Sequence, residues 1–114
     1  MPVDARGQAL SPWILNADTR AAEEVGEWEA RLGRGRTFAI TGTVVQPAFP
    51  LLKLQWLRRH EARLFASAAL FVSVVDSILL EMGLPPYLDY SLASRFLMFD
   101  VQAHRWSEPI LDAA

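Results

Sequence analysis

The chain has no cysteine among its 114 residues, which excludes a disulfide framework and any thiolate metal site. It also has no long apolar run. The uncharged, apolar stretch at residues 64–75 is too short for a membrane span, which needs about 20 residues. The first ten residues carry an acid and a glycine where a signal peptide needs an apolar centre. We therefore expect a soluble, cytoplasmic protein without a membrane partner.

Basic clusters are also scarce, because the formal net charge is −2 and the largest groups are Arg34/Arg36 and Arg58/Arg59. This balance weighs against a nucleic-acid partner. The only two histidines lie far apart, without a serine or a cluster of acids at useful spacing. The sequence therefore gives no support for a catalytic triad or a metal site.

Apolar residues, in contrast, are abundant. They make up 52% of the chain, and charged residues make up 21%. A chain of this length forms one domain at most and has a high surface-to-volume ratio. The excess predicts apolar surface that another part of a protein covers, and self-association where that surface is bare. The tryptophans are dispersed and are predicted to anchor the core; they are Trp13, Trp28, Trp56 and Trp106.

An apolar stripe at helical spacing predicts a helix that begins at Asp18 and stops at Gly33. The stripe consists of Ala21, Val25, Trp28 and Leu32. Asn16, Asp18 and Thr19 are all possible N-caps. The glycines and arginines of residues 33–36 predict a mobile loop.

Further elements follow from local patterns. A strand is predicted at residues 1–3, before a turn at Gly7. Helices are predicted at residues 51–60, 61–66 and 76–82, and a buried strand is predicted at residues 70–74. The run Phe96-Leu97-Met98-Phe99 does not alternate, so it predicts a strand covered on both faces of a layered α/β core. Asp89 is expected to brace the polar turn before it through backbone N–H groups.

The chain ends shortly after a well-formed helix start. Ser107 is the expected N-cap, followed by Glu108 and Pro109. Only seven residues remain from Glu108 to Ala114, fewer than the ~12–15 that an isolated helix needs to persist. Together with the very short first strand, this helix predicts a piece of a larger protein.

Several short motifs also follow one another in a fixed order. They are VDARGQAL at 3–10, PWILNADTR at 12–20, TG at 41–42, KLQWL at 53–57 and DYSLAS at 89–94, with Asp76 thirteen residues before Asp89. In order and spacing they resemble the FGGY carbohydrate kinases, particularly the xylulokinase- and gluconokinase-like branch. The resemblance covers nearly the whole chain. It implies a helix-rich α/β fold, an incomplete ribonuclease H-like (actin-like ATPase) domain, with residues 1–114 as an inner part of the N-terminal, sugar-binding domain.

The resemblance implies a segment of an enzyme that transfers phosphate from Mg-ATP to a sugar or polyol hydroxyl. The family's Asp-x-Gly-Thr turn, its general-base aspartate and its nucleotide domain have no counterpart in these residues. We therefore expect no catalytic residue, metal ligand or cofactor site in this chain, and no activity of the chain alone. Alternatives are a free-standing, non-catalytic remnant that binds a sugar or a protein, and a truncated reading frame without function.

Four residues are predicted to bind substrate on the basis of the resemblance. Asn16 stands where the family carries a tryptophan that borders the sugar in several relatives, and Ala48 stands where polyol-specific relatives carry a tyrosine. Asp18 and Arg20 share the segment of Asn16, although helix capping and charge anchoring are the favoured interpretation for them. Lys53 is interpreted as a solvated helix charge, or as a donor to a loop carbonyl, rather than as a phosphate ligand.

Overall fold

In the computed structural model, which describes residues 1–114, the chain begins with strand β1 (Pro2–Val3), which pairs antiparallel with β2 (Leu70–Phe71). The predicted turn after β1 is present. Gly7 adopts a φ of 78°, which glycine tolerates, and its N–H donates to the Asp4 carbonyl at 3.0 Å. The first strand and its glycine turn are therefore confirmed.

Helix α1 (Ala22–Arg31) carries the predicted stripe, and Trp28 is almost completely buried. The helix begins later than expected, and no side chain caps its first turn. The predicted capping roles of Asn16, Asp18 and Thr19 are therefore wrong.

Helix α2 (Arg34–Thr41) lies where a mobile loop was predicted. Gly33, with a φ of 85°, separates α1 from α2. The indole N–H of Trp28 then donates to the Thr37 hydroxyl at 2.9 Å inside the protein. The loop prediction for residues 33–36 is wrong because a buried contact between two helices orders this segment.

Helix α3 (Pro50–His60) and the shorter α4 (Ala62–Ser67) agree with the sequence prediction. Leu51 and Leu52 of α3 belong to the main hydrophobic core, together with residues of α1 and α7. The core therefore includes elements from both ends of the sequence.

Charged residues also join α1 to α3. The Glu24 carboxylate is only 1% exposed and lies 3.6 Å from the Arg59 guanidinium, without a hydrogen bond to either oxygen. Arg59 also binds the exposed Glu27, through Nη1 at 2.8 Å. Since a buried carboxylate is costly without a cationic partner, Arg59 compensates the charge that α1 buries.

Helix α5 (Val74–Glu81) begins earlier than predicted and shortens the strand before it. Ser73 and Asp76 form a reciprocal capping box: the Ser73 hydroxyl accepts from the Asp76 N–H at 3.3 Å, and the Asp76 carboxylate accepts from the Ser73 N–H at 2.8 Å. Of the buried strand predicted for residues 70–74, only Leu70 and Phe71 form a strand, because this cap starts a helix at Val74. The predicted burial is also wrong, since Leu70 is exposed and Phe71 is half-buried.

Asp89 caps helix α6 (Tyr90–Ser94) by accepting from the Leu92 N–H at 2.8 Å. The predicted bracing role is confirmed, although the segment is helical rather than a turn. Beyond α6, the predicted two-sided strand is wrong. Leu97 is fully buried at a φ of 63°, where the backbone bends, so β3 (Phe99–Asp100) is a short strand.

Strand β3 pairs only with β4 (Arg105–Trp106), and α7 (Glu108–Ala113) completes the chain. The Ser107 hydroxyl caps nothing, contrary to prediction, and its backbone N–H donates to the Met98 carbonyl at 2.8 Å. The predicted anchoring role of the tryptophans holds for Trp28, whereas Trp13 is 36% and Trp106 is 42% exposed.

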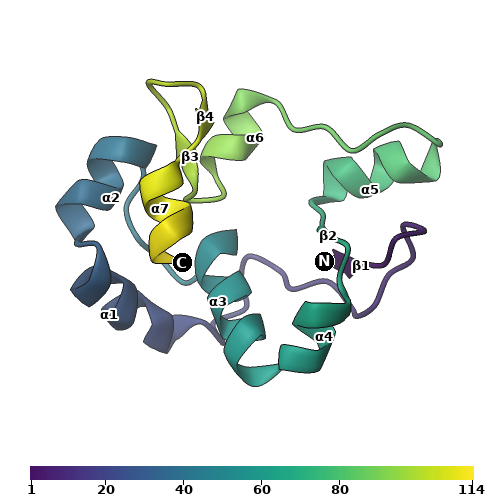
Figure 1. Ribbon diagram of the computed structural model, residues 1–114, viewed down its shortest axis with the longest axis horizontal. Coiled ribbons are helices and arrows are strands. Elements are labelled where there is room, and N and C mark those ends of the chain that lie inside the picture. Colours follow the sequence, from purple (N-terminus) through teal and green to yellow (C-terminus); the bar gives the residue numbers. More distant parts are fainter.

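The elements form a ring (Figure 1). One side holds α1, α2 and α7, the other holds β1, β2 and α5, and α3 and α4 connect them. The predicted helix-rich α/β composition is confirmed, with two separate two-stranded sheets. No helix combines the length and the apolar composition needed to cross a membrane.

One side of α5 is apolar and uncovered. Val74, Ile78 and Met82 lie four residues apart along the helix and are 60%, 54% and 67% exposed. We expect the purified 114-residue chain to self-associate and to bind a hydrophobic dye, because exposed apolar patches favour both. Light scattering and dye fluorescence measure the two effects.

Replacing Ile78 and Met82 together by lysine should reduce dye binding and association. Glu81→Lys on the same helix is the control, because it alters charge without removing apolar surface. A monodisperse chain that binds no dye would contradict this expectation.

Candidate functional site

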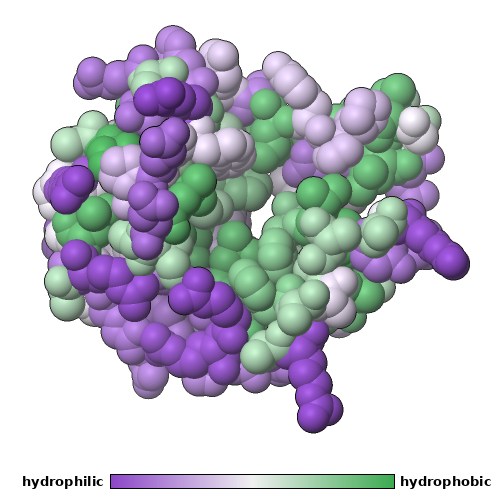
Figure 2. Space-filling view, in the orientation of Figure 1, coloured by the Kyte–Doolittle hydropathy of each residue, from purple (hydrophilic) through white to green (hydrophobic).

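A cavity of about 650 Å³, which we call the central hollow, opens among β1, β2, the start of α5, α3, α6 and the loops beside them. Of its 21 lining residues, 14 are hydrophobic. The polar side chains that line it are Asn16, Gln46, Lys53, Ser73 and Arg95. Figure 2 shows apolar side chains gathered around the opening. A mostly apolar cavity with few polar groups is typical of small-molecule sites, whose volumes are roughly 300–1,000 Å³.

The structure brings two of the predicted site residues to this hollow. Asn16 and Ala48 both line it, although they come from different loops. Asp18 and Arg20 do not line it and bind each other beside it. The substrate-binding role of all four stays a prediction.

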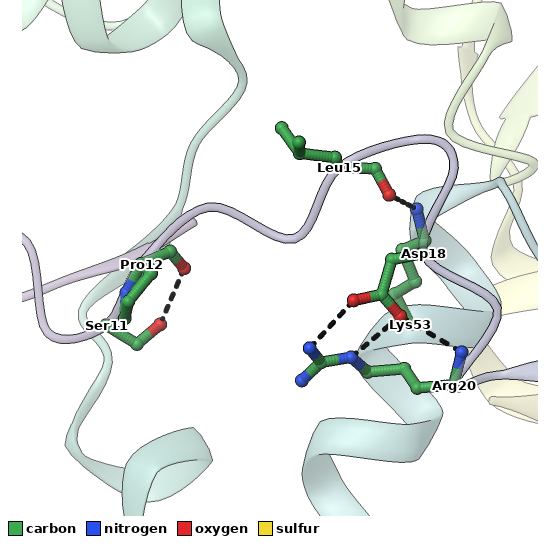
Figure 3. A network of polar contacts seen from close by, with 6 residues as sticks. All are labelled: Ser11, Pro12, Leu15, Asp18, Arg20 and Lys53. Atoms are coloured by element: carbon green, nitrogen blue, oxygen red, sulfur yellow. Dashed lines mark hydrogen bonds and ion pairs between the residues drawn. The ribbon is translucent and has the colours of Figure 1, made fainter.

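Asn16 lies at the corner of a tight turn. The Asp18 N–H donates to the Leu15 carbonyl at 3.0 Å and closes the turn, with Asn16 and Ala17 between them (Figure 3). The side chain of Asn16 is exposed and makes no hydrogen bond to the rest of the chain. Its amide is therefore free to bind a ligand in the hollow.

Lys53 of α3 holds the start of this turn. Its ammonium group donates to the Leu15 carbonyl at 2.6 Å, and the residue is only 6% exposed. Burial lowers the pKa of Lys53 below its ordinary value, an effect that nearby Asp18 opposes. Of the readings that the sequence left open, donation to a loop carbonyl is confirmed.

Asp18 and Arg20 hold the end of the turn. The Asp18 carboxylate accepts from the Arg20 side chain at 2.7 and 2.9 Å and from its backbone N–H at 3.0 Å. The Arg20 guanidinium lies 4.8 Å from the ring centre of Trp56, a cation–π contact. Because Trp56 follows Lys53 by three positions on α3, one face of that helix reaches both ends of the turn.

Other features of the hollow were missed by the sequence analysis. Gln46, Ser73 and Arg95 come from three separate segments, and no local pattern indicated that they meet. Lys53 had a signal, because a lysine between Leu52 and Leu54 interrupts an apolar stretch. Nowhere in the structure do three or more histidine or acidic side chains converge in a way suited to a metal ion. The hollow can therefore offer hydrogen bonds and apolar contact.

We expect the Asp18 carboxyl to titrate with a pKa of about 2 in the folded protein, because the Arg20 side chain binds its ionised form. Since this pKa is depressed, the ion pair stabilises the fold above the unfolded value of about 3.9 and is lost as the pH falls through the folded value. Carboxyl NMR measures the midpoint.

Arg20→Met should raise that midpoint toward about 4, the value of an unpaired aspartate. Arg6→Met is the control, since Arg6 makes no side-chain bond to Asp18. A midpoint near 4 in the unaltered protein would show that the ion pair does not persist in solution.

Comparisons with known proteins identify relatives across this whole region. The family model for the N-terminal domain of the FGGY family of carbohydrate kinases matches residues 1–114. Xylulose kinase of Escherichia coli is 34% identical over 111 residues, which are 97% of this chain and 22% of that protein. Gluconokinase of Bacillus subtilis is 26% identical over 112 residues, 98% of this chain and 22% of that protein.

Solved structures agree with the sequence matches. The structure of xylulose kinase from Rhodospirillum rubrum superposes with a TM-score of 0.87 at 26% identity, over 98% of this chain and 23% of that one. A kinase structure from Brucella ovis gives a TM-score of 0.81 at 34% identity, over 97% of this chain and 22% of that one. The predicted fold class, an incomplete domain of the actin-like ATPase type, is confirmed, and the chain spans less than a quarter of its relatives. The chain belongs to the FGGY family of carbohydrate kinases.

Proposed function

We propose that residues 1–114 are an inner part of the sugar-binding domain of an ATP-dependent kinase that phosphorylates a sugar or polyol hydroxyl. The observation that carries this proposal is the family match over the whole chain, combined with coverage of only 22% of the E. coli xylulose kinase. The names of the relatives favour a sugar substrate such as a pentulose or a hexonate.

The task of this segment is to bind and orient the sugar. The amide of Asn16 offers both a donor and an acceptor, which is what a sugar hydroxyl requires. Ala48, which lines the hollow from another loop, has a small side chain and leaves room for the sugar. The apolar side chains around the hollow limit the access of water to the hydrogen bond between Asn16 and the sugar. Asp18 and Arg20 contribute indirectly by fixing the turn that carries Asn16.

Phosphate transfer itself requires positioning of the phosphates and neutralisation of their charge. Mg-ATP, implied by the family, would supply the transferred phosphoryl group. No group of histidine or acidic side chains in this chain is arranged to hold a magnesium ion. The residues of this segment act on the sugar alone.

The full-length protein that contains this segment should form ADP from Mg-ATP in the presence of one member of a panel of pentuloses, hexonates and polyols. The isolated 114-residue chain should form none, because it spans less than a quarter of its active relatives. A coupled ADP assay measures both. Sugar-dependent ADP release by the isolated chain would contradict the fragment proposal, and inactivity of both proteins would favour the non-catalytic alternative.

In the full-length enzyme, Asn16→Ala should raise the KM for the sugar and leave the melting temperature unchanged. Losing one hydrogen bond to a neutral hydroxyl costs about 0.5–1.5 kcal/mol, roughly a 2- to 12-fold change in KM. Gln8→Ala removes an exposed amide outside the hollow and is the control. An Asn16→Ala enzyme with an unaltered KM would remove Asn16 from the sugar site.

A further inference from the structure

We propose that Lys53 is a positioning residue: by holding the Leu15 carbonyl, it fixes the orientation of Asn16 and thereby sets the affinity of the site for sugar. This inference rests on the proposed function and extends it to a residue that has no direct role in the chemistry. It starts from the unusual surroundings of the Lys53 charge.

The Lys53 ammonium is buried where an apolar side chain would be less costly. The residue is 6% exposed, lies beside the fully buried Leu52, and forms no ion pair. Its one hydrogen-bond acceptor is the Leu15 carbonyl, at 2.6 Å. A buried charge whose only hydrogen-bond acceptor is a neutral carbonyl is costly, and the nearby Asp18 carboxylate offsets part of that cost without pairing with Lys53. The presence of Lys53 is therefore better explained by the position in which it holds the Leu15 carbonyl than by a contribution to the stability of the fold.

The atom that Lys53 holds belongs to the same peptide group as the nitrogen of Asn16. A peptide group is planar, so a donor that fixes the Leu15 carbonyl also fixes the plane in which the Asn16 nitrogen and Cα lie. The same carbonyl accepts the Asp18 N–H at 3.0 Å, which closes the turn. Lys53 therefore binds the peptide group directly before Asn16. The oxygen of that group also accepts the Asp18 N–H, the hydrogen bond that closes the turn.

The far end of the turn is held from the same helix. Trp56 supports Arg20, and Arg20 binds Asp18 through two side-chain hydrogen bonds. Asn16 thus stands between two contacts that both depend on α3. Only the Lys53 contact faces the hollow, because Lys53 lines it whereas Asp18 and Arg20 do not.

A double-mutant cycle in the full-length enzyme tests the inference. Lys53→Met removes the donor and keeps the approximate volume of the side chain. It should raise the KM for the sugar by roughly 2- to 12-fold, as for one lost hydrogen bond, without lowering kcat. In the Asn16→Ala background the same change should have little further effect on KM, because residues that act through one contact are not additive.

A second readout does not depend on activity. Hydrogen exchange at the Asp18 amide, which donates to the Leu15 carbonyl, should become faster in Lys53→Met when it is measured without sugar. Arg58→Met is the matched control, because Arg58 lies exposed on the same helix and does not line the hollow. If Lys53→Met does not fold, Lys53→Leu, which also lacks a donor, takes its place in the same cycle.

Three results would overturn the inference. The first is an unchanged KM in the Lys53 variant. The second is an equal rise of KM with and without Asn16, which would mean that Lys53 touches the sugar itself. The third is unchanged hydrogen exchange in the turn. If the unaltered full-length protein phosphorylates no sugar, the proposed function is wrong, and hydrogen exchange alone decides whether Lys53 holds the turn.

Discussion

The position of helix α3 is the constraint on which both sides of the ring depend. Its first turn places Leu51 and Leu52 in the main core, its middle supplies Lys53 to the loop of Leu15, and its last turn supplies Arg59 to the buried Glu24. An α-helix of eleven residues makes about three turns, so its side chains leave in every direction. One rigid element can therefore fix the core, the first helix and the candidate site at the same time.

Local patterns in the sequence were enough to predict those elements whose start and stop signals lie within the element itself. The helix at 51–60 was predicted from a local pattern, and Asp89 was predicted as a brace from its side-chain chemistry. Helix α2 was missed because its order comes from the contact between Trp28 and Thr37, which lies outside any local window. The apolar run at 96–99 was misread because burial at a backbone bend and burial in a strand give the same composition.

The candidate site could be predicted only in part from the sequence, because its residues come together through long-range contacts. Asn16 and Ala48 came from a resemblance to known motifs, whereas their common position on one hollow is a property of the folded chain. The lysine–tryptophan spacing in KLQWL was recognised as a motif, but its physical meaning required the structure: one helical face reaches both ends of the turn at 15–18. Ser73 and Arg95 join the hollow only through long-range packing, so no sequence pattern could indicate them.

The resemblance places Asn16 where several relatives carry an aromatic residue, and in the proposed sugar site this difference changes what the turn must provide. An aromatic ring beside a sugar makes broad apolar contact that tolerates small rotations of the backbone. An amide binds through hydrogen bonds, which weaken steeply when the angle at the hydrogen falls toward about 120°. A turn that carries asparagine therefore needs a more closely defined backbone than one that carries tryptophan. In the proposed site, the buried Lys53 contact supplies that definition, so Asn16 depends on this contact more closely than an aromatic residue would.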